Sequence, residues 1–159
     1  MNMEDMKLPE FLRTNEQWRI GDYLPNITIP NYEDLKLYDL IDDYLLVAAL
    51  STNCAPCLPA MKALDAFIQK HPYYKLIMFV VTDEHKFELT KMAFHESARL
   101  YIATEEVMSQ QIKVRGYPWA YGLNSEGQII TIAHAGRVEF LEKLAAPFSR
   151  FHKPVMVAE

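Results

Sequence analysis

Two cysteines, Cys54 and Cys57, stand where a buried strand is predicted to give way to a helix. Residues 44–50 form a continuous apolar run, which is typical of a strand covered on both faces in the middle of a sheet. Residues 56–70 follow it with apolar side chains spaced three or four apart, which predicts an amphipathic helix whose inward stripe is Leu58, Met61, Leu64, Phe67 and Ile68. A central strand that leads at once into a helix predicts an α/β fold.

The rest of the chain continues this alternation. The expected elements are strands at 76–81 and 100–102, helices at 83–94 and from Thr104, a hairpin of 119–123 with 128–133, and a last helix at 138–148. Before them, residues 26–30 and 35–37 predict a separate N-terminal β-hairpin. We therefore expect an α/β sandwich with a mixed sheet. It forms one domain over 1–159, with a core at 18–149, a lead at 1–17 and a tail at 150–159.

Charge and hydropathy exclude two classes of partner. The chain of 159 residues has a formal net charge of −5, whereas proteins that bind nucleic acid through its phosphates normally carry an excess of Lys and Arg, so we expect no nucleic acid. No apolar run approaches the ~20 residues that a membrane-spanning helix needs. The N-terminus has neither a basic region nor an apolar region of the kind found in export signals. We expect a cytoplasmic protein, with a processed exported form as the open alternative.

The cysteine spacing predicts redox chemistry. If the helix begins near Asn53 or Cys54, unsatisfied backbone N–H groups and the helix dipole favour the thiolate of Cys54, which is the nucleophilic form. Cys57 returns to the same side one turn later, with its Cα roughly 5–6 Å away, a distance that a disulfide permits. Cys54 would then attack and Cys57 would resolve, while Pro56 stiffens the loop between them.

Two other interpretations of the pair stay open at this point. It could be two inert buried cysteines, or half of a zinc site, because C-x-x-C pairs also bind zinc. Zinc needs two further ligands, and the five histidines show no H-x₃₋₅-H spacing and no second cysteine pair accompanies them. We therefore expect no metal and no cofactor beyond the cysteine pair.

Three further motifs accompany the cysteines. Pro118 precedes the predicted hairpin, Gly136 precedes the last helix, and the segment Ile20-Gly21-Asp22-Tyr23-Leu24-Pro25 precedes the first strands. In this order the motifs resemble the thioredoxin-like superfamily, in its TlpA/ResA/MauD-like branch. The resemblance covers residues 18–149. It implies a three-layer sandwich with a mixed central sheet, helices on both faces and an N-terminal β-hairpin extension.

The same resemblance assigns roles to residues. Cys54 would be the attacking thiol and Cys57 the resolving one. Pro118 would be a cis-proline, and the backbone of Tyr117 would pair with an extended substrate segment. The further residues expected to contact a substrate are Asn53, Ala55 and Pro56.

Three positions depart from the family pattern. Asn53 replaces the usual Trp before the first cysteine, and Ala48 and Ala60 stand where relatives carry an acidic residue. A buried carboxylate near the pair helps to deprotonate the resolving thiol. Its absence predicts slow general turnover, or a carboxylate supplied from elsewhere, and favours a specialised client.

The expected function is thus a thiol-disulfide oxidoreductase that acts on a cysteine-containing protein or peptide and is recycled by a redox partner. A peroxiredoxin-like peroxidase is one alternative. Its P-x-x-x-[ST]-x-x-C loop finds Ser51 in the hydroxyl position but Val47 where the proline belongs. A non-catalytic binding module that uses the Tyr117 edge is the other.

Overall fold

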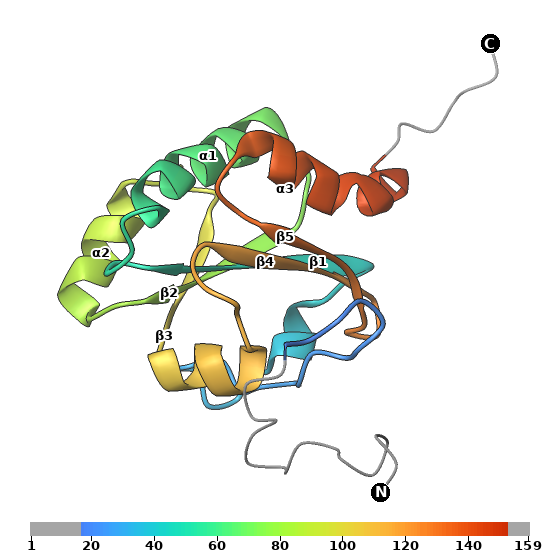
Figure 1. Ribbon diagram of the computed structural model, residues 1–159, viewed down its shortest axis with the longest axis horizontal. Coiled ribbons are helices and arrows are strands. Elements are labelled where there is room, and N and C mark those ends of the chain that lie inside the picture. The colour runs from blue at the N-terminus through green and yellow to red at the C-terminus, as the bar shows by residue number, and fades with distance from the viewer. Residues whose placement is uncertain (1–16, 153–159) are drawn as a thin grey trace, which may run out of the picture.

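A computed structural model describes residues 17–152, which form a five-stranded sheet in the order β3-β2-β1-β4-β5 (Figure 1). The central strand β1 (Tyr44–Ser51) pairs parallel with β2 (Leu76–Val81) and antiparallel with β4 (Trp119–Asn124). The edges are β3 (Arg99–Ala103) and β5 (Ile129–His134). The predicted mixed sheet is therefore confirmed.

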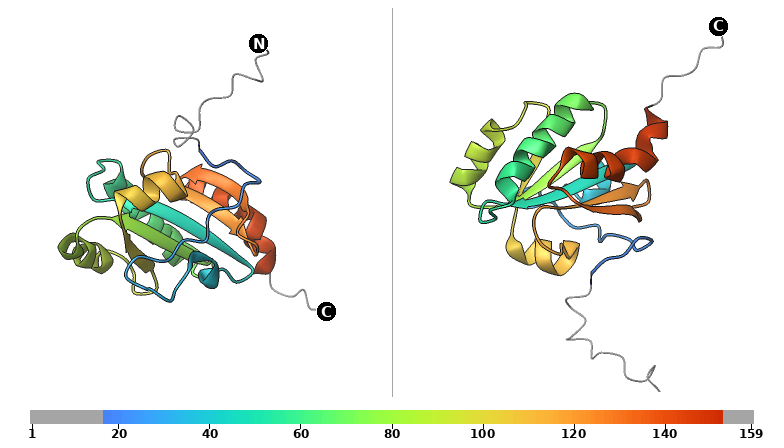
Figure 2. Two further views of the ribbon diagram at one scale, coloured as in Figure 1. Left: turned by 90° about the horizontal axis from the view of Figure 1, so that it is seen from below. Right: turned by 45° about the horizontal axis from the view of Figure 1, so that its top comes forward.

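Helices cover both faces of this sheet, which gives three layers (Figures 1 and 2). One face carries α1 (Cys57–Lys70), α2 (Glu84–Met92) and α3 (Val138–Ala145). The other face carries a π-helix, Val107–Ile112, and the N-terminal segment. Two 3₁₀ helices, Leu37–Leu40 and Ala146–Phe151, complete the described secondary structure.

Strand β1 explains how one segment supports two cores. All eight of its residues are buried. Because successive side chains of a strand point to opposite faces, they divide between two apolar clusters. Those of Leu46, Ala48 and Leu50 belong to the cluster under α1 and α3, whereas Leu45 and Val47 belong to the cluster on the π-helix side. The continuous apolar run in the sequence reflects this double burial.

The N-terminal hairpin is shorter than predicted. Thr28 and Lys36 form a single β-bridge, flanked by hydrogen bonds from Ile29 N to Leu35 O and from Leu37 N to Ile27 O, both 2.8 Å long. The hairpin stops there because a 3₁₀ helix begins at Leu37. The predicted lead and tail fall largely on residues 1–16 and 153–159, which lie outside the described residues.

Two helix predictions need correction. The buried stripe of α1 is Cys57, Ala60, Leu64 and Phe67, and Leu58, predicted to face inward, is 64% exposed. The helix is thus rotated so that the second cysteine itself joins the core. The predicted last helix at 138–148 is α-helical only to Ala145, after which the 3₁₀ helix that contains Pro147 follows.

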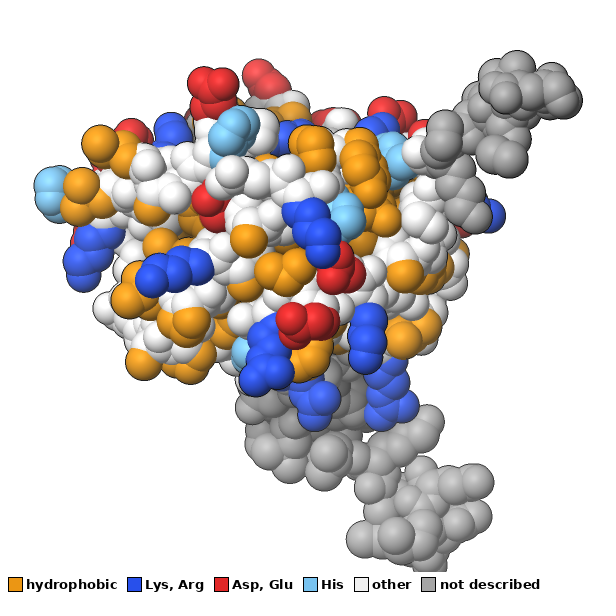
Figure 3. Space-filling model, turned by 90° about the horizontal axis from the view of Figure 1, so that it is seen from above, with side chains coloured by type: hydrophobic (Ala, Val, Ile, Leu, Met, Phe, Trp, Pro, Cys, Tyr) orange, Lys and Arg blue, Asp and Glu red, His pale blue; other side chains and the backbone are white. Residues whose placement is uncertain are grey.

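The surface over α1 and α3 mixes acidic, basic and apolar side chains (Figure 3). Within residues 17–152, no helix is both long and apolar enough to span a bilayer. In the same part of the chain, no three His, Cys, Asp or Glu side chains are grouped so as to hold a metal ion.

Candidate redox site

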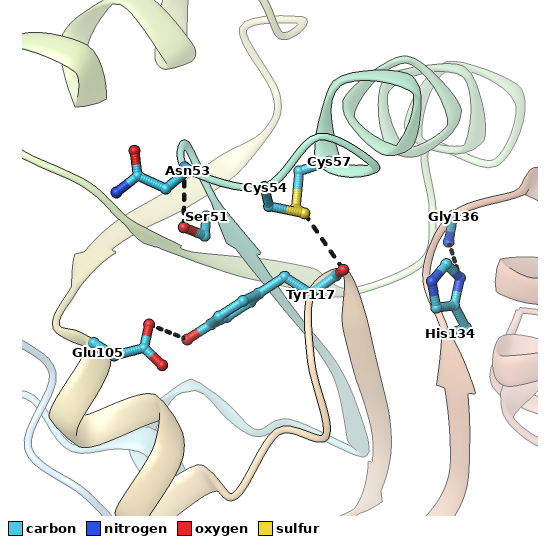
Figure 4. The surroundings of a disulfide bond; sticks show 8 residues. All are labelled: Ser51, Asn53, Cys54, Cys57, Glu105, Tyr117, His134 and Gly136. Carbon is cyan, nitrogen blue, oxygen red and sulfur yellow. Dashed lines mark hydrogen bonds between the residues drawn. A yellow bond between two sulfur atoms is a disulfide. The ribbon is translucent and has the colours of Figure 1, made fainter.

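The cysteine pair lies at the junction of β1 and α1, at the carboxyl end of the central strand (Figure 4). A disulfide joins Cys54 and Cys57, whose Cα atoms are 5.2 Å apart. These are the only two cysteines of the chain. The predicted spacing therefore brings both sulfur atoms into bonding contact.

The turn between the cysteines differs from the predicted one. Helix α1 begins at Cys57 with Pro56 as its N-cap, so neither Asn53 nor Cys54 caps it. Residues 54–56 form a turn in which Cys57 N donates to Cys54 O at 3.1 Å. Leu58 N donates to Ala55 O at 3.4 Å. Because the turn carbonyls accept these N–H groups, the helix terminus stabilises a Cys54 thiolate less than the sequence suggested.

The two sulfur-bearing residues have unequal surroundings. Cys54 is partly exposed, whereas Cys57 is 1% exposed within the apolar cluster under α1 and α3. Ala48 and Ala60, at the two positions where an acid was noted as missing, are both fully buried in this same cluster. A thiol in such surroundings loses its proton reluctantly, because the thiolate would be desolvated.

The segment Tyr117-Pro118 closes the site from the side of β4. The peptide bond between these residues is cis, and Pro118 is buried. The carbonyl oxygen of Tyr117 lies 3.4 Å from Cys54 Sγ. In the disulfide form the Cys54 sulfur carries no hydrogen, so this is a van der Waals contact and not a hydrogen bond. In the reduced protein the Cys54 thiol can donate a hydrogen bond to that oxygen.

The Tyr117 side chain points away from the sulfurs, toward the start of the π-helix (Figure 4). Its hydroxyl donates to Glu105 Oε2 at 3.0 Å. Burial of the ring, and then the negative charge of Glu105, raise the pKa of Tyr117 well above its usual value. Glu105 was not singled out from the sequence, where no motif links it to Tyr117. This hydrogen bond holds the Tyr117 ring at the start of the π-helix, while the Tyr117 carbonyl oxygen faces Cys54.

The remaining predicted contact residues lie around the sulfur atoms. Asn53, Ala55 and Pro56 are all exposed. The backbone of Asn53 is held by its N–H, which donates to Ser51 Oγ at 3.1 Å, and its side-chain amide points away from the disulfide (Figure 4). The structure thus gathers Cys54, Cys57, Tyr117 and Pro118 at the centre and leaves these three residues on the rim.

A second loop, which follows β5, lies beside the Tyr117 segment. Ala135 N donates to Pro118 O at 3.3 Å, which joins the two segments. Gly136 N donates to His134 Nδ1 at 3.2 Å. A Cβ atom at Gly136 would meet the His134 ring at 2.6 Å, so the ring could not keep this position beside any other residue. Gly136 was identified in the sequence as the residue before the last helix, whereas His134 was not singled out.

Comparison with protein-family models and with curated proteins gives no match. Solved structures give clear ones. A candidate thiol:disulfide interchange protein DsbE from Chlorobium tepidum is similar with a TM-score of 0.68 at 14% identity, over 82% of this chain and 98% of that one. The thioredoxin domain of a thiol-disulfide oxidoreductase from Bacteroides vulgatus gives 0.58 at 18% identity, over 83% and 99%.

The exposed lipoprotein thioredoxin of Streptococcus pneumoniae gives a TM-score of 0.56 at 15% identity, over 70% of this chain and 90% of that one. At sequence identities this low, the structural similarity establishes the fold alone, and all three structures share that fold. The sheet order, the helices on both faces and the disulfide between β1 and α1 agree with this result. The chain therefore has a thioredoxin-like fold, with a C-x-x-C disulfide after its central strand.

Proposed function

We propose that the protein is a thiol-disulfide oxidoreductase that exchanges the Cys54–Cys57 pair with cysteines of a client protein or peptide. The observation that carries this proposal is the unequal burial of two bonded cysteines beside the Tyr117 backbone. Cys54 is partly exposed to solvent, and Cys57 is bonded to it from the buried side, where it can displace whatever Cys54 binds. The branch that we infer within the superfamily is the TlpA/ResA/MauD-like one, which the order of motifs supports.

In the reductive direction, the Cys54 thiolate attacks one sulfur of a client disulfide. The client S–S bond breaks, a mixed disulfide forms, and the other client sulfur leaves as a thiolate that takes up a proton. Cys57 then loses its proton and attacks Cys54 Sγ, which releases the second client thiol. The client gains two electrons and two protons, and the pair ends as the disulfide. A redox partner must reduce it again, and the reverse sequence oxidises a client dithiol.

The client would lie in an extended conformation along Tyr117. The carbonyl oxygen of Tyr117 already faces the sulfur to which the client becomes attached, and a strand added there forms backbone hydrogen bonds. Asn53, Ala55 and Pro56 are exposed on the opposite rim, where they can contact the residues on either side of the client cysteine. Pro118 would hold this edge in place.

Two broader proposals accompany this one. We infer that the chain acts as a single domain with its core at 18–149. We also propose that the exchange takes place in the cytoplasm, where the disulfides that occur are usually transient and catalytic. Both cysteines of the chain belong to one C-x-x-C pair, which supports a catalytic role for the disulfide and not a structural one. Because one of the similar structures is a lipoprotein, a location outside the cytoplasm is the competing proposal. Fractionation of the source cell would decide between the two locations.

Reduction of insulin disulfides tests the activity. Wild-type protein, kept reduced by excess dithiol, should accelerate the reaction, and Cys54→Ser should abolish the acceleration because the attacking sulfur is gone. Cys57→Ser should accept one client molecule and hold it as a mixed disulfide that mass spectrometry detects. A non-catalytic binding module would instead be inactive and would retain its partner in the Cys54→Ser variant. A peroxidase would consume peroxide without exchanging disulfides.

A further inference from the structure

Two arginines flank the edge where the client is proposed to lie, and we infer that they select clients with acidic residues near the reactive cysteine. Arg115 precedes Tyr117 by two residues, and Arg137 follows Gly136. This inference rests on the proposed function and names the substrate class of the same site.

Both guanidinium groups are held against aromatic rings. The Cζ atom of Arg115 lies 5.9 Å from the centre of the Trp119 ring, and that of Arg137 lies 5.8 Å from the centre of the Phe140 ring. A guanidinium stacked on a ring keeps its N–H groups free at the edge, where they match the two oxygens of a carboxylate. The rings therefore pre-orient both groups for binding an anion.

Neither guanidinium has a carboxylate partner within residues 17–152. The ion pairs in this part of the chain involve Lys70, His71, Lys75 and Lys91 instead. The neighbouring carboxylates are Glu105, which accepts the Tyr117 hydroxyl, and Glu139 in the first turn of α3. Both arginine side chains are exposed, so their charges are available to a docked molecule.

The two loops that carry the arginines lie at the same end of the sheet. Trp119 pairs with His134, and Ala135 N donates to Pro118 O, so the loops that carry the two arginines leave the sheet side by side. Arg115 is two residues before Tyr117, and Arg137 is two residues after Ala135, so both arginines are close to the Tyr117-Pro118 edge along the chain. A client cysteine at Cys54 would bring residues two to four positions away within reach of these long side chains.

The test compares three synthetic peptides that share one cysteine and differ only in the residues two to four positions from it, which are Glu, Gln or Lys. Each cysteine is activated as a 2-pyridyl disulfide. Attack by Cys54 on the peptide sulfur forms the mixed disulfide, breaks the pyridyl S–S bond and releases pyridine-2-thione, whose absorbance gives the rate. At low ionic strength the Glu peptide should react about tenfold faster than the Gln peptide, and the Lys peptide more slowly than either. In 0.5 M salt the preference should fall to about twofold, because mobile ions screen exposed charges.

The double variant Arg115→Gln/Arg137→Gln should lose most of this preference while its rate with the Gln peptide stays the same. Arg150→Gln is the matched control. Arg150 also stacks on a ring, 4.8 Å from the centre of Phe151, but it lies past the far end of α3 (Figure 1). Equal rates for the Glu and Lys peptides, or a preference that survives in the double variant, would overturn the inference. If the Gln peptide still reacts and Cys54→Ser abolishes that reaction, the proposed function stands even then. If no peptide reacts, the proposed function itself fails.

Discussion

The replacement Ala60→Glu should accelerate the second step of exchange, the attack of Cys57 on the mixed disulfide. Ala60 lies one helical turn after Cys57 on the buried stripe of α1, and both side chains are within the same apolar cluster. Residues three apart in a helix have Cβ atoms about 5–6 Å apart, so a glutamate at position 60 could reach the Cys57 thiol directly or through one water. The variant places a proton acceptor one helical turn from Cys57, at a position where this chain has alanine.

The size of the effect follows from the burial of Cys57. An ordinary thiol ionises near pH 8.5, so only about 3% is thiolate at pH 7, and the 1% exposure of Cys57 lowers that fraction further. A well-placed general base contributes about 10²-fold or more. We therefore expect resolution to be about a hundredfold faster at pH 7. Burying the larger polar side chain should cost about 2–4 kcal/mol of unfolding free energy, because Ala60 is fully buried.

Rapid mixing of the reduced protein with a peptide disulfide, followed by acid quenching and mass spectrometry, measures the lifetime of the mixed disulfide. Ala60→Gln is the matched control, since it has the same size and polarity but accepts no proton at neutral pH. The wild-type resolution rate should rise with pH between 6 and 8, and that of the Glu variant should rise less. Equal rates for the Glu and Gln variants would show that a base at position 60 does not assist Cys57. A wild-type mixed disulfide that resolves quickly and independently of pH would show that loss of the Cys57 proton does not limit resolution.

Three further predictions concern stability. Burial raises the pKa of Tyr121 to about 12. Between pH 10 and 12 the unfolded chain therefore binds fewer protons than the folded one. In urea unfolding, the contribution of Tyr121 to stability should be fully present below pH 10 and should fall above it by up to about 2 kcal/mol. The Tyr121→Phe variant should show a flatter dependence of stability on pH. Gly122→Ala should lower the unfolding free energy by about 1–3 kcal/mol in the same assay, because a Cβ there would lie 2.7 Å from Cε2 of the buried Phe148; an unchanged midpoint would contradict this packing. Reducing the Cys54–Cys57 disulfide should cost about 2 kcal/mol, as loop-closure entropy predicts for so short a loop, and the Cys54→Ser/Cys57→Ser variant should be insensitive to reductant.

Local structure was predictable wherever the sequence carries a periodic pattern or a cap. The continuous apolar run 44–50 identified the central strand, since only a strand buried on both faces needs one. Asp83 is the N-cap of α2, and its side chain accepts from Lys86 N, as an aspartate directly before a helix commonly does. The phase of α1 was predicted incorrectly, because Leu58 fits the apolar period equally well yet faces solvent.

That two cysteines three residues apart follow a buried strand and precede a helix could be inferred from local patterns alone, because strand, turn and helix preferences are local. The groups that surround the two cysteines come from distant parts of the chain and depend on how it folds. The pairing of Ala49 with Trp119 brings Tyr117 to the end of β1, 63 residues away from Cys54 in the chain, and sets its carbonyl oxygen beside the sulfur. Glu105 comes from the segment after β3 and accepts the Tyr117 hydroxyl, and the loop with Arg137 is joined to the same segment by the bond from Ala135 N to Pro118 O. Such contacts depend on sheet register and on the packing of two cores, which are long-range consequences of burial that no short motif records.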